Sequence, residues 1–320
     1  MQDQTKGILY AVITALFWGV LAVALKVAVR KVDAATIVWF RFTLAFLPLL
    51  VWSSFRNRRH LRMLVKPPLL LVIATLALAW NYLGFNLGVQ YTTPGNAQLF
   101  IQTGQILLAV AGIFFFGERF STRQTVGFIM ALAGLLLFYN QQLSHFSENE
   151  ALYRYGIFLT LTGAVAWALY AALQKKLVVR HSALSLNLFL FGLPALLYLP
   201  WVDFSALAGL NWLWWLLMAF LGMNTLVAYT TLALSLRYLE AGKTSVILIM
   251  NPIITFVLMA LLTTLEVNWI EPEKFTLLSI TGAILVLTGA LLVIWKKRNG
   301  SLLLNKEKGS ASFWGKRPDF

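Results

Sequence analysis

Residues 7–29 read GILYAVITALFWGVLAVALKVAV, an apolar run in which Lys26 is the only charged residue. The hydrocarbon core of a bilayer is about 30 Å thick and an α-helix rises about 1.5 Å per residue, so a spanning helix needs about 20 apolar residues. A secretory signal has a shorter apolar core of about 7–15 residues, followed by a small-residue cleavage site. No clear site of that kind follows residue 29. We therefore predict a retained transmembrane helix here.

The composition extends this prediction to the whole chain. Of its 320 residues, 59% are hydrophobic and only 12% are charged, against about 25% charged in an average soluble protein. The mean hydropathy is +0.75. Such a chain lacks the polar residues that a water-exposed surface needs, which argues against a soluble enzyme, a disordered chain or a nucleic-acid-binding module. The absence of cysteine excludes disulfides, thiolate metal sites and a thiol nucleophile.

Nine further apolar segments follow the first, and short polar or proline-containing connections separate them. We expect them at residues 34–54, 68–90, 94–116, 123–140, 155–177, 183–201, 211–236, 243–264 and 274–295. The longest internal connection, residues 141–154, is polar, and a polar tail occupies residues 296–320. The predicted fold class is an all-α integral membrane protein with ten transmembrane helices.

The distribution of basic residues predicts the orientation. If the N-terminus is cytoplasmic, twenty of the 26 Lys and Arg residues fall on the cytoplasmic side, and seven of the 12 acidic residues fall on the other. Cytoplasmic loops carry such an excess of Lys and Arg. We therefore expect both termini in the cytoplasm. The same bias accounts for the net charge of +14 without a nucleic-acid partner.

The two halves of the chain resemble each other. Gly7, Trp18 and Lys26 recur as Gly156, Trp167 and Lys175 at an offset of 149 residues. Further matches pair Tyr91 with Tyr238, Gly95 with Gly242, Glu118 with Glu266, Gly127 with Gly282 and Gly134 with Gly289. Each half has five segments, an odd number, so the second half would cross the membrane upside down. We expect a first repeat at 7–140, a connecting loop at 141–154, a second repeat at 155–295 and a cytoplasmic tail at 296–320. Inverted repeats are typical of secondary transporters, whose site lies at the midplane between the halves.

With these residues in view, the chain resembles the drug/metabolite transporter superfamily, specifically the ten-helix EamA-type transporters, over residues 7–295. In the first half the resemblance rests on Ala15-Leu16-Phe17-Trp18-Gly19, Lys26, Arg41-Phe42, Gly117-Glu118-Arg119, Gly127 and Gly134. In the second half it rests on Trp167, Lys175, Tyr238, Ala241-Gly242, Pro252, Glu266, Gly282 and Gly289. The resemblance implies a bacterial inner-membrane carrier of amino acids or related metabolites. One departure is Gln105, where the family usually has a proline, while Pro252 is kept in the second half.

Polar side chains at membrane depth are the strongest candidates for a substrate site, because an unsatisfied polar group in hydrocarbon costs several kcal/mol. Gln98, Gln102 and Gln105 share one face of their segment, and Gln102 lies about 12 Å from its start. Asn81, Asn224 and Asn251 reach a similar depth. They either line a central cavity formed by segments 68–90, 94–116, 211–236 and 243–264, or bridge helices to one another. Trp18, Tyr82 and Tyr229 either stack on a substrate or pack in the core.

Charged side chains within the segments are few. Lys26 and Arg41 lie near the predicted outer end, and Lys175 is the repeat equivalent of Lys26 near the inner end. We expect these three to act at gates and to attract a carboxylate. No acidic residue lies at midplane depth, so the expected partners are a small polar or zwitterionic metabolite and membrane lipids. Glu118 and Glu266, at segment ends, are expected to be solvated.

The sequence offers little for catalysis or cofactor binding. His60, His145 and His181 lie in predicted loops, and no metal-ligand spacing or glycine-rich phosphate loop is present. We therefore expect no enzyme activity, cofactor or metal. The leading prediction is a secondary exporter or exchanger of amino acids or related metabolites. An importer, or a non-transporting membrane receptor or scaffold, remains an alternative. A chain without a midplane carboxylate favours facilitated diffusion or exchange over proton coupling.

Overall fold

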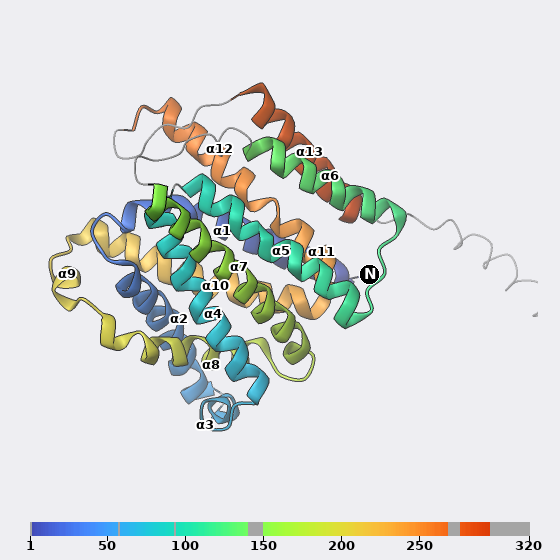
Figure 1. Ribbon diagram of the computed structural model, residues 1–320. Coiled ribbons are helices and arrows are strands. Elements are labelled where there is room, and N and C mark those ends of the chain that lie inside the picture. Colours follow the sequence, from blue (N-terminus) through green and yellow to red (C-terminus); the bar gives the residue numbers. More distant parts are fainter. Residues whose placement is uncertain (1, 57, 93, 140–149, 268–275, 295–320) are drawn as a thin grey trace, which may run out of the picture.

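The structure, a computed structural model, describes residues 2–56, 58–92, 94–139, 150–267 and 276–294 (Figure 1). Within these ranges the secondary structure is entirely helical. The α-helices are α1 Gln2–Ala28, α2 Ala34–Arg56, α3 Arg62–Val65, α4 Leu69–Tyr91, α5 Pro94–Phe116, α6 Thr122–Tyr139, α7 Glu150–Val178, α8 Ala183–Leu197, α9 Phe204–Ala208, α10 Trp212–Tyr238, α11 Ala241–Leu248, α12 Asn251–Thr264 and α13 Leu277–Ile294. Two short 3₁₀ helices, Arg58–Leu61 and Leu199–Trp201, lie between them.

Six helical segments are long and apolar enough to cross a membrane: Asp3–Ala28, Ala34–Arg56, Leu69–Tyr91, Ala151–Val178, Trp212–Tyr238 and Ala241–Thr264. Shorter apolar stretches occupy α5, α6, α8 and α13. Large apolar side chains such as Phe55, Phe114 and Phe115 are exposed on these helices, as expected where a helix faces lipid rather than water. The chain is therefore an all-helical protein with several helices of membrane-spanning length.

The predicted segment limits differ from the observed helices in several places. Helix α1 starts at Gln2, five residues before the predicted segment 7–29. Helix α7, the first helix of the second half, starts at Glu150, five residues before the predicted segment 155–177. The segment 183–201 ends as an α-helix at Leu197 and continues as a 3₁₀ turn. The segment 243–264 consists of two helices, α11 and α12. The predicted tail and most of the loop 141–154 lie outside the described residues.

Proline chemistry explains the break between α11 and α12. Pro252 has no backbone N–H to donate to the carbonyl of Leu248, where α11 ends, so the regular helix cannot run through this point. At the corresponding place in the first half the chain has Gln105, and α5 is continuous from Pro94 to Phe116. The Pro/Gln difference between the halves therefore produces one broken and one unbroken helix.

The packing of helices fits a two-repeat architecture. Helix α1 packs against α10 as α4 packs against α7, α1 against α12 as α7 against α5, and α2 against α10 as α8 against α4. Exchanging the first-half and second-half helices converts each pair into its counterpart. Gly7 contacts Tyr238 and Leu239, and its repeat equivalent Gly156 contacts Tyr91 and Thr92.

Helices α6 and α13 form a separate pair that lies side by side along one edge of the molecule (Figure 1). A Cβ atom added to Gly127 would lie 2.6 Å from the carbonyl oxygen of Gly289, and one added to Gly289 would lie 2.4 Å from that of Gly127. Gly134 approaches the carbonyl oxygen of Gly282 in the same way, at 2.6 Å. Small residues at these positions thus let the two backbones touch. Helices α5 and α11 contact each other, and they connect this pair to the rest of the molecule, because α5 also contacts α6 and α11 also contacts α13.

Candidate functional site

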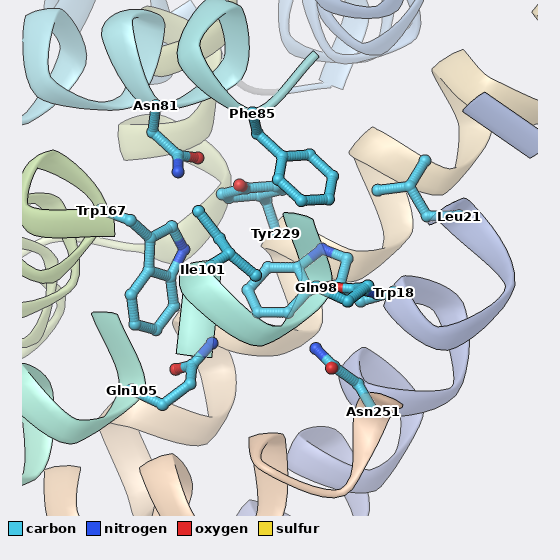
Figure 2. A pocket seen from close by; sticks show the side chains of 10 residues that line it. All are labelled: Trp18, Leu21, Asn81, Phe85, Gln98, Ile101, Gln105, Trp167, Tyr229 and Asn251. Atoms are coloured by element: carbon cyan, nitrogen blue, oxygen red, sulfur yellow. The ribbon is translucent and has the colours of Figure 1, made fainter. Parts of the chain in front are cut away.

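A cavity lies between the two halves of the molecule (Figure 2). The volume in it that the centre of a water molecule can reach is about 50 Å³. Its walls come from α1, α4, α5, α7, α10 and α12. The lining residues are Trp18, Leu21, Asn81, Phe85, Gln98, Ile101, Gln105, Trp167, Tyr229 and Asn251. The predicted cavity helices all contribute. Helix α1 adds Trp18, a predicted site residue, and α7 adds Trp167, which the prediction omitted.

Aromatic rings form much of the wall. The ring centroids of Trp18 and Trp167 are 5.7 Å apart with an interplanar angle of 76°, and those of Trp18 and Tyr229 are 5.5 Å apart. Edge-to-face contacts at these distances are favourable because the positive edge of one ring meets the negative face of another. Trp18 and Trp167 are repeat equivalents, so each half supplies one ring of the pair. These surfaces can stack on an apolar or aromatic part of a ligand.

Amide side chains supply the polar part of the wall. Asn81 Nδ2 donates to the carbonyl oxygen of Gly163 at 3.0 Å, which joins α4 to α7. Gln98 Nε2 donates to Thr255 Oγ1 at 3.4 Å, which joins α5 to α12. Both side chains also line the cavity. Bridging and lining, the two roles that the sequence left open, therefore coexist in these residues.

Two predicted site residues bridge helices without lining the cavity. Gln102 Nε2 donates to Asn251 Oδ1 at 2.7 Å, and Asn224 Nδ2 donates to the carbonyl oxygen of Phe17 at 2.6 Å. Gln102 thus holds Asn251, which does line the cavity. Tyr82 also lies outside the lining, with its ring centroid 5.5 Å from that of Tyr229. These three residues act behind the cavity wall.

Trp167 was missed as a lining residue, although its repeat equivalence with Trp18 could have found it. Gln105 was already named with Gln98 and Gln102 from the face that they share. Gln105 lines the cavity, and its Oε1 atom has no hydrogen-bond partner among the described residues. Leu21 and Ile101 carry no signal in sequence that separates them from other apolar residues.

The two equivalent lysines make equivalent contacts. Lys26 Nζ donates to the carbonyl oxygen of Thr92, just after α4, at 3.5 Å. Lys175 Nζ donates to the carbonyl oxygen of Leu239, just after α10, at 3.0 Å. Neither side chain lines the cavity. Within its own half, each lysine instead ties the end of the first helix to the end of the third helix.

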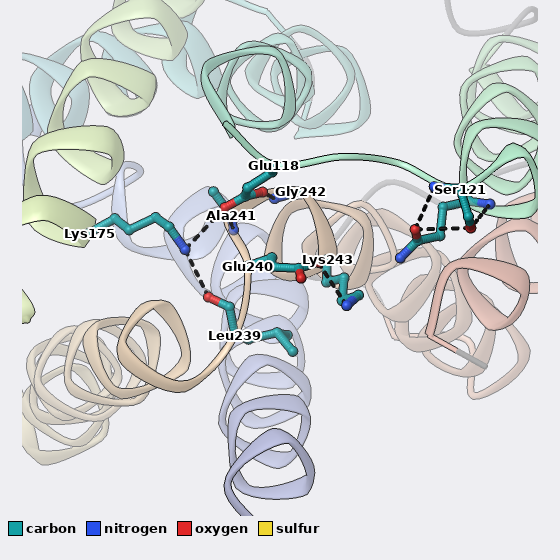
Figure 3. A network of polar contacts seen from close by, with 9 residues as sticks. Glu118, Ser121, Lys175, Leu239, Glu240, Ala241, Gly242 and Lys243 are labelled. Carbon is teal, nitrogen blue, oxygen red and sulfur yellow. Dashed lines mark hydrogen bonds and ion pairs between the residues drawn. The ribbon is translucent and has the colours of Figure 1, made fainter. Parts of the chain in front are cut away.

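Glu118 is the centre of a polar network at the Lys175 end (Figure 3). Its Oε1 atom accepts from the backbone N–H of Ala241 at 2.7 Å, and its Oε2 atom accepts from that of Gly242 at 2.9 Å. Lys175 Nζ lies 3.2 Å from Oε1, and the Glu118 side chain is only 7% exposed. The expectation of a solvated side chain is therefore wrong for Glu118. The carboxylate binds the N-terminus of α11, where unpaired N–H groups and the helix dipole favour a negative charge.

Glu266, which the sequence aligned with Glu118, does not occupy the position that corresponds to Glu118. It is exposed just after the end of α12, in the left-handed backbone region with φ of 52°. The residue in the corresponding left-handed position after α5 is Gly117, with φ of 63°. The repeat is therefore imperfect at this end, where the second half carries additional residues.

Arg41 lies deeper inside the helix bundle than the predicted position at the outer gate. Its side chain is 2% exposed. The Nε atom donates to Thr225 Oγ1 at 3.1 Å, and the Cζ atom lies 4.4 Å from the centroid of the Tyr82 ring. The guanidinium is thus held between α2, α4 and α10, behind the cavity wall.

Comparisons with known proteins can now be set beside this geometry. The model of the EamA-like transporter family matches residues 5–140 and again residues 154–295. A protein of Escherichia coli K12 named "Uncharacterized inner membrane transporter YhbE" is 30% identical over 293 residues, which cover 91% of each chain. An "Uncharacterized transporter" of Haemophilus influenzae is 28% identical over 91% of this chain and 95% of its own length.

Two more distant similarities agree with these matches. A "Probable amino-acid metabolite efflux pump" of Escherichia coli K12 is 24% identical over 92% of this chain and 98% of its own. A solved crystal structure that is 18% identical superposes with a TM-score of 0.70 and covers 90% of this chain and 96% of its own, which shows a common fold. The family model covers both halves and the helices have the length and apolarity of membrane spans, so the chain belongs to the EamA-like transporter family.

Proposed function

We propose that the protein is a secondary transporter that works by alternating access and exports or exchanges amino acids or related small metabolites across the inner membrane. The observation that carries this proposal is a cavity between two related halves, each of which contributes one tryptophan of a contacting pair. A site between repeats is where secondary transporters bind their substrates. The name of the efflux pump among the relatives supports the substrate class.

The proposed topology has ten spanning helices in two inverted repeats, with both termini in the cytoplasm. In that orientation the network of Glu118, Lys175 and the N-terminus of α11 lies at the cytoplasmic end of the bundle. We take this network to hold the inner end closed, since it ties α5, α7 and α11 together. Its release would let the halves rock and expose the cavity to the cytoplasm. Lys26 occupies the equivalent position at the outer end.

The polar lining suits a small polar or zwitterionic molecule. Asn81, Gln98, Gln105 and Asn251 offer neutral donors and acceptors, and none of the residues that line the cavity in the described part of the chain is acidic. A proton relay at membrane depth normally uses an acidic or histidine side chain. The cavity therefore favours exchange or facilitated diffusion.

Counterflow tests the proposal. Purified protein is placed in liposomes preloaded with single amino acids, and uptake of the labelled amino acid is measured for wild type, Gln105→Ala and Gln90→Ala. Gln90 is an exposed glutamine near the end of α4 and serves as the matched control. We expect uptake that depends on the matching internal solute, that falls at least about tenfold in Gln105→Ala because a lining amide is lost, and that is retained in Gln90→Ala.

The alternatives give different results. In oriented vesicles, accumulation of external substrate through the outer face alone would favour an importer. Folded protein without counterflow for any amino acid would overturn the proposed substrate class. The receptor or scaffold alternative requires amides bonded only to one another and no cavity, whereas this structure has lining amides and a cavity.

A further inference from the structure

A positive charge is buried inside the bundle, and none of the described residues gives it an acidic partner. Arg41 lies seven residues into α2, about 10 Å from its start at 1.5 Å per residue. Ion pairs join Lys6 to Asp3, Lys175 to Glu118 and Lys243 to Glu240, whereas no described acidic residue pairs with Arg41. A buried cation is costly unless a counter-charge or several acceptors surround it. Its usual interpretation at membrane depth is a functional site.

The groups around Arg41 add donors. A guanidinium carries five N–H donors, and Thr225 accepts from one of them. The Tyr82 hydroxyl lies near Arg41, Thr225 and Tyr229, but within the described part of the chain none of them meets it with hydrogen-bond geometry. The hydroxyl of Tyr170 is also buried without a partner there. The cluster thus holds a positive charge and unused O–H donors, which is the composition of a receptor for an anion.

This cluster adjoins the cavity. Tyr229 lines the cavity, and its ring centroid lies 5.5 Å from that of Tyr82 and 5.7 Å from that of Tyr170. Asn81, the residue before Tyr82 in α4, also lines it. In Figure 2 the Tyr229 hydroxyl points toward the side of the cavity formed by Asn81 and Phe85. Arg41 itself does not line the cavity, and its guanidinium lies over the Tyr82 ring, so direct contact with a ligand requires this ring to turn aside.

The geometry points to a carboxylate subsite centred on Arg41, with Tyr82 as a hydroxyl donor. The inference rests on the proposed function and specifies its substrate class as carboxylate-bearing molecules. The carboxylate binds at Arg41, because hydrogen bonds between a guanidinium and a carboxylate are charge-assisted and frequently bidentate, which makes them about twice as strong as neutral ones. The remainder of the molecule lies in the cavity between the tryptophans and the amides. Small cations without a carboxylate are poor substrates.

The test compares acids with their carboxamides, which have nearly the same shape and lack the charge. Counterflow of labelled leucine, phenylalanine and threonine is competed by each amino acid and by its own carboxamide. We expect the carboxamide to compete at least about tenfold more weakly in wild type, and within about threefold of the acid in Arg41→Gln. Arg41→Lys keeps the charge and should retain part of the preference. Tyr82→Phe keeps the ring beneath the guanidinium but removes the hydroxyl, and should weaken the preference severalfold.

Arg237→Gln is the matched control. Arg237 also lies over a tyrosine ring, at 5.8 Å from the centroid of Tyr238, but it is exposed at the end of α10. Its removal should leave the wild-type preference unchanged. A folded Arg41→Gln protein with the wild-type preference, or a wild type that treats acid and carboxamide alike, would overturn the subsite.

A binding measurement separates this inference from the proposed function. The melting temperature of purified wild type and Arg41→Gln is measured with isovalerate and with isovaleramide. If isovalerate but not isovaleramide raises the melting temperature of wild type, and Arg41→Gln loses this effect, the subsite is supported. This holds even if no amino acid shows counterflow, because that result would overturn only the proposed substrate. Counterflow of amino acids with equal stabilisation by both probes would leave the transporter proposal intact and overturn the subsite.

Discussion

At the scale of single residues, the cavity depends on pairs that the repeat creates. Trp18 and Trp167 occupy equivalent positions in α1 and α7, and their rings meet edge to face. Neither half could build this wall alone, since each supplies one ring. The lining amides have two roles at once, because Asn81 and Gln98 donate hydrogen bonds to neighbouring helices while their side chains still line the cavity.

Trp167→Ala should lower the rate of counterflow at least about tenfold, because it removes one face of the cavity and the edge contact with Trp18. Trp167→Phe keeps a smaller ring and should lose less. The comparison is initial uptake in proteoliposomes, with Trp212→Ala as the control because Trp212 is exposed at the start of α10. Equal losses in Trp167→Ala and Trp212→Ala would argue against a role of Trp167 in the cavity.

Gln102 and Gln105 should respond differently to removal. Gln102→Ala leaves Asn251 Oδ1 without its donor, and an unpaired buried polar atom costs about 1–3 kcal/mol. Gln105→Ala removes a side-chain oxygen that has no partner among the described residues, so little stability should be lost. We expect the melting temperature to fall more in Gln102→Ala and the affinity for substrate to fall more in Gln105→Ala. The reverse order in both measurements would contradict the assignment of bridging and lining roles.

At the scale of elements, the contacts of α11 distinguish it from the other helices around the cavity. Its N-terminus is bound by the carboxylate of Glu118, which lies just after α5. Its C-terminus is interrupted before α12, where Pro252 cannot continue the hydrogen-bond ladder. Ser245, in the middle of α11, donates to the carbonyl oxygen of Gln105 on α5. Glu118 at its N-terminus and Ser245 in its middle thus fasten this short helix to α5 and the residues just after it.

Glu118→Gln should open the inner end more often, because the amide loses the charge that pairs with Lys175 and keeps only one acceptor oxygen. The chain has no cysteine, so Ser245→Cys provides a single reporter between α11 and α5. We expect faster labelling of this cysteine by a membrane-impermeant maleimide from the cytoplasmic side in Glu118→Gln. Glu240→Gln is the control, since Glu240 precedes the same helix but pairs with Lys243 and is largely exposed. Unchanged labelling in a folded Glu118→Gln protein would exclude the proposed closure.

At the scale of the whole molecule, the two halves are interleaved rather than placed side by side. Helices α1 and α4 of the first half pack against α10 and α7 of the second, and α6 pairs with α13 at the edge (Figure 1). Such interleaving surrounds the cavity with helices from both repeats. Under the proposed alternating-access mechanism, a rocking motion of the halves would therefore change access to the cavity from both sides of the membrane.

The predicted orientation can be tested with two single cysteines in this cysteine-free chain. Ser205→Cys lies in the exposed connection between α8 and α10, and Val179→Cys lies in the exposed connection after α7. If both termini are cytoplasmic, an impermeant maleimide should label the cysteine at position 205 in intact cells, and the one at position 179 only after permeabilisation. The opposite pattern would show the reverse orientation.

Sequence alone was sufficient for the membrane-protein class, the positions of most helices and the family. Apolar length is a local property, and the helices α2, α4, α5 and α6 begin and end within two residues of the predicted segments. The repeat was also visible, since Trp18 and Lys26 recur at a constant offset. These features need no knowledge of how distant segments pack.

Only the tertiary structure decided which polar groups face the cavity. The rotation of a helix about its axis depends on contacts with helices far away in sequence, so Gln105 lines the cavity while Gln102 bonds to Asn251. Glu118 looked like a solvated residue at a segment end until α11 was placed beside it. The burial of Arg41 behind Tyr82 likewise arises from α2, α4 and α10 meeting at one point. Local sequence sets what a segment is, and long-range packing sets what each of its side chains touches.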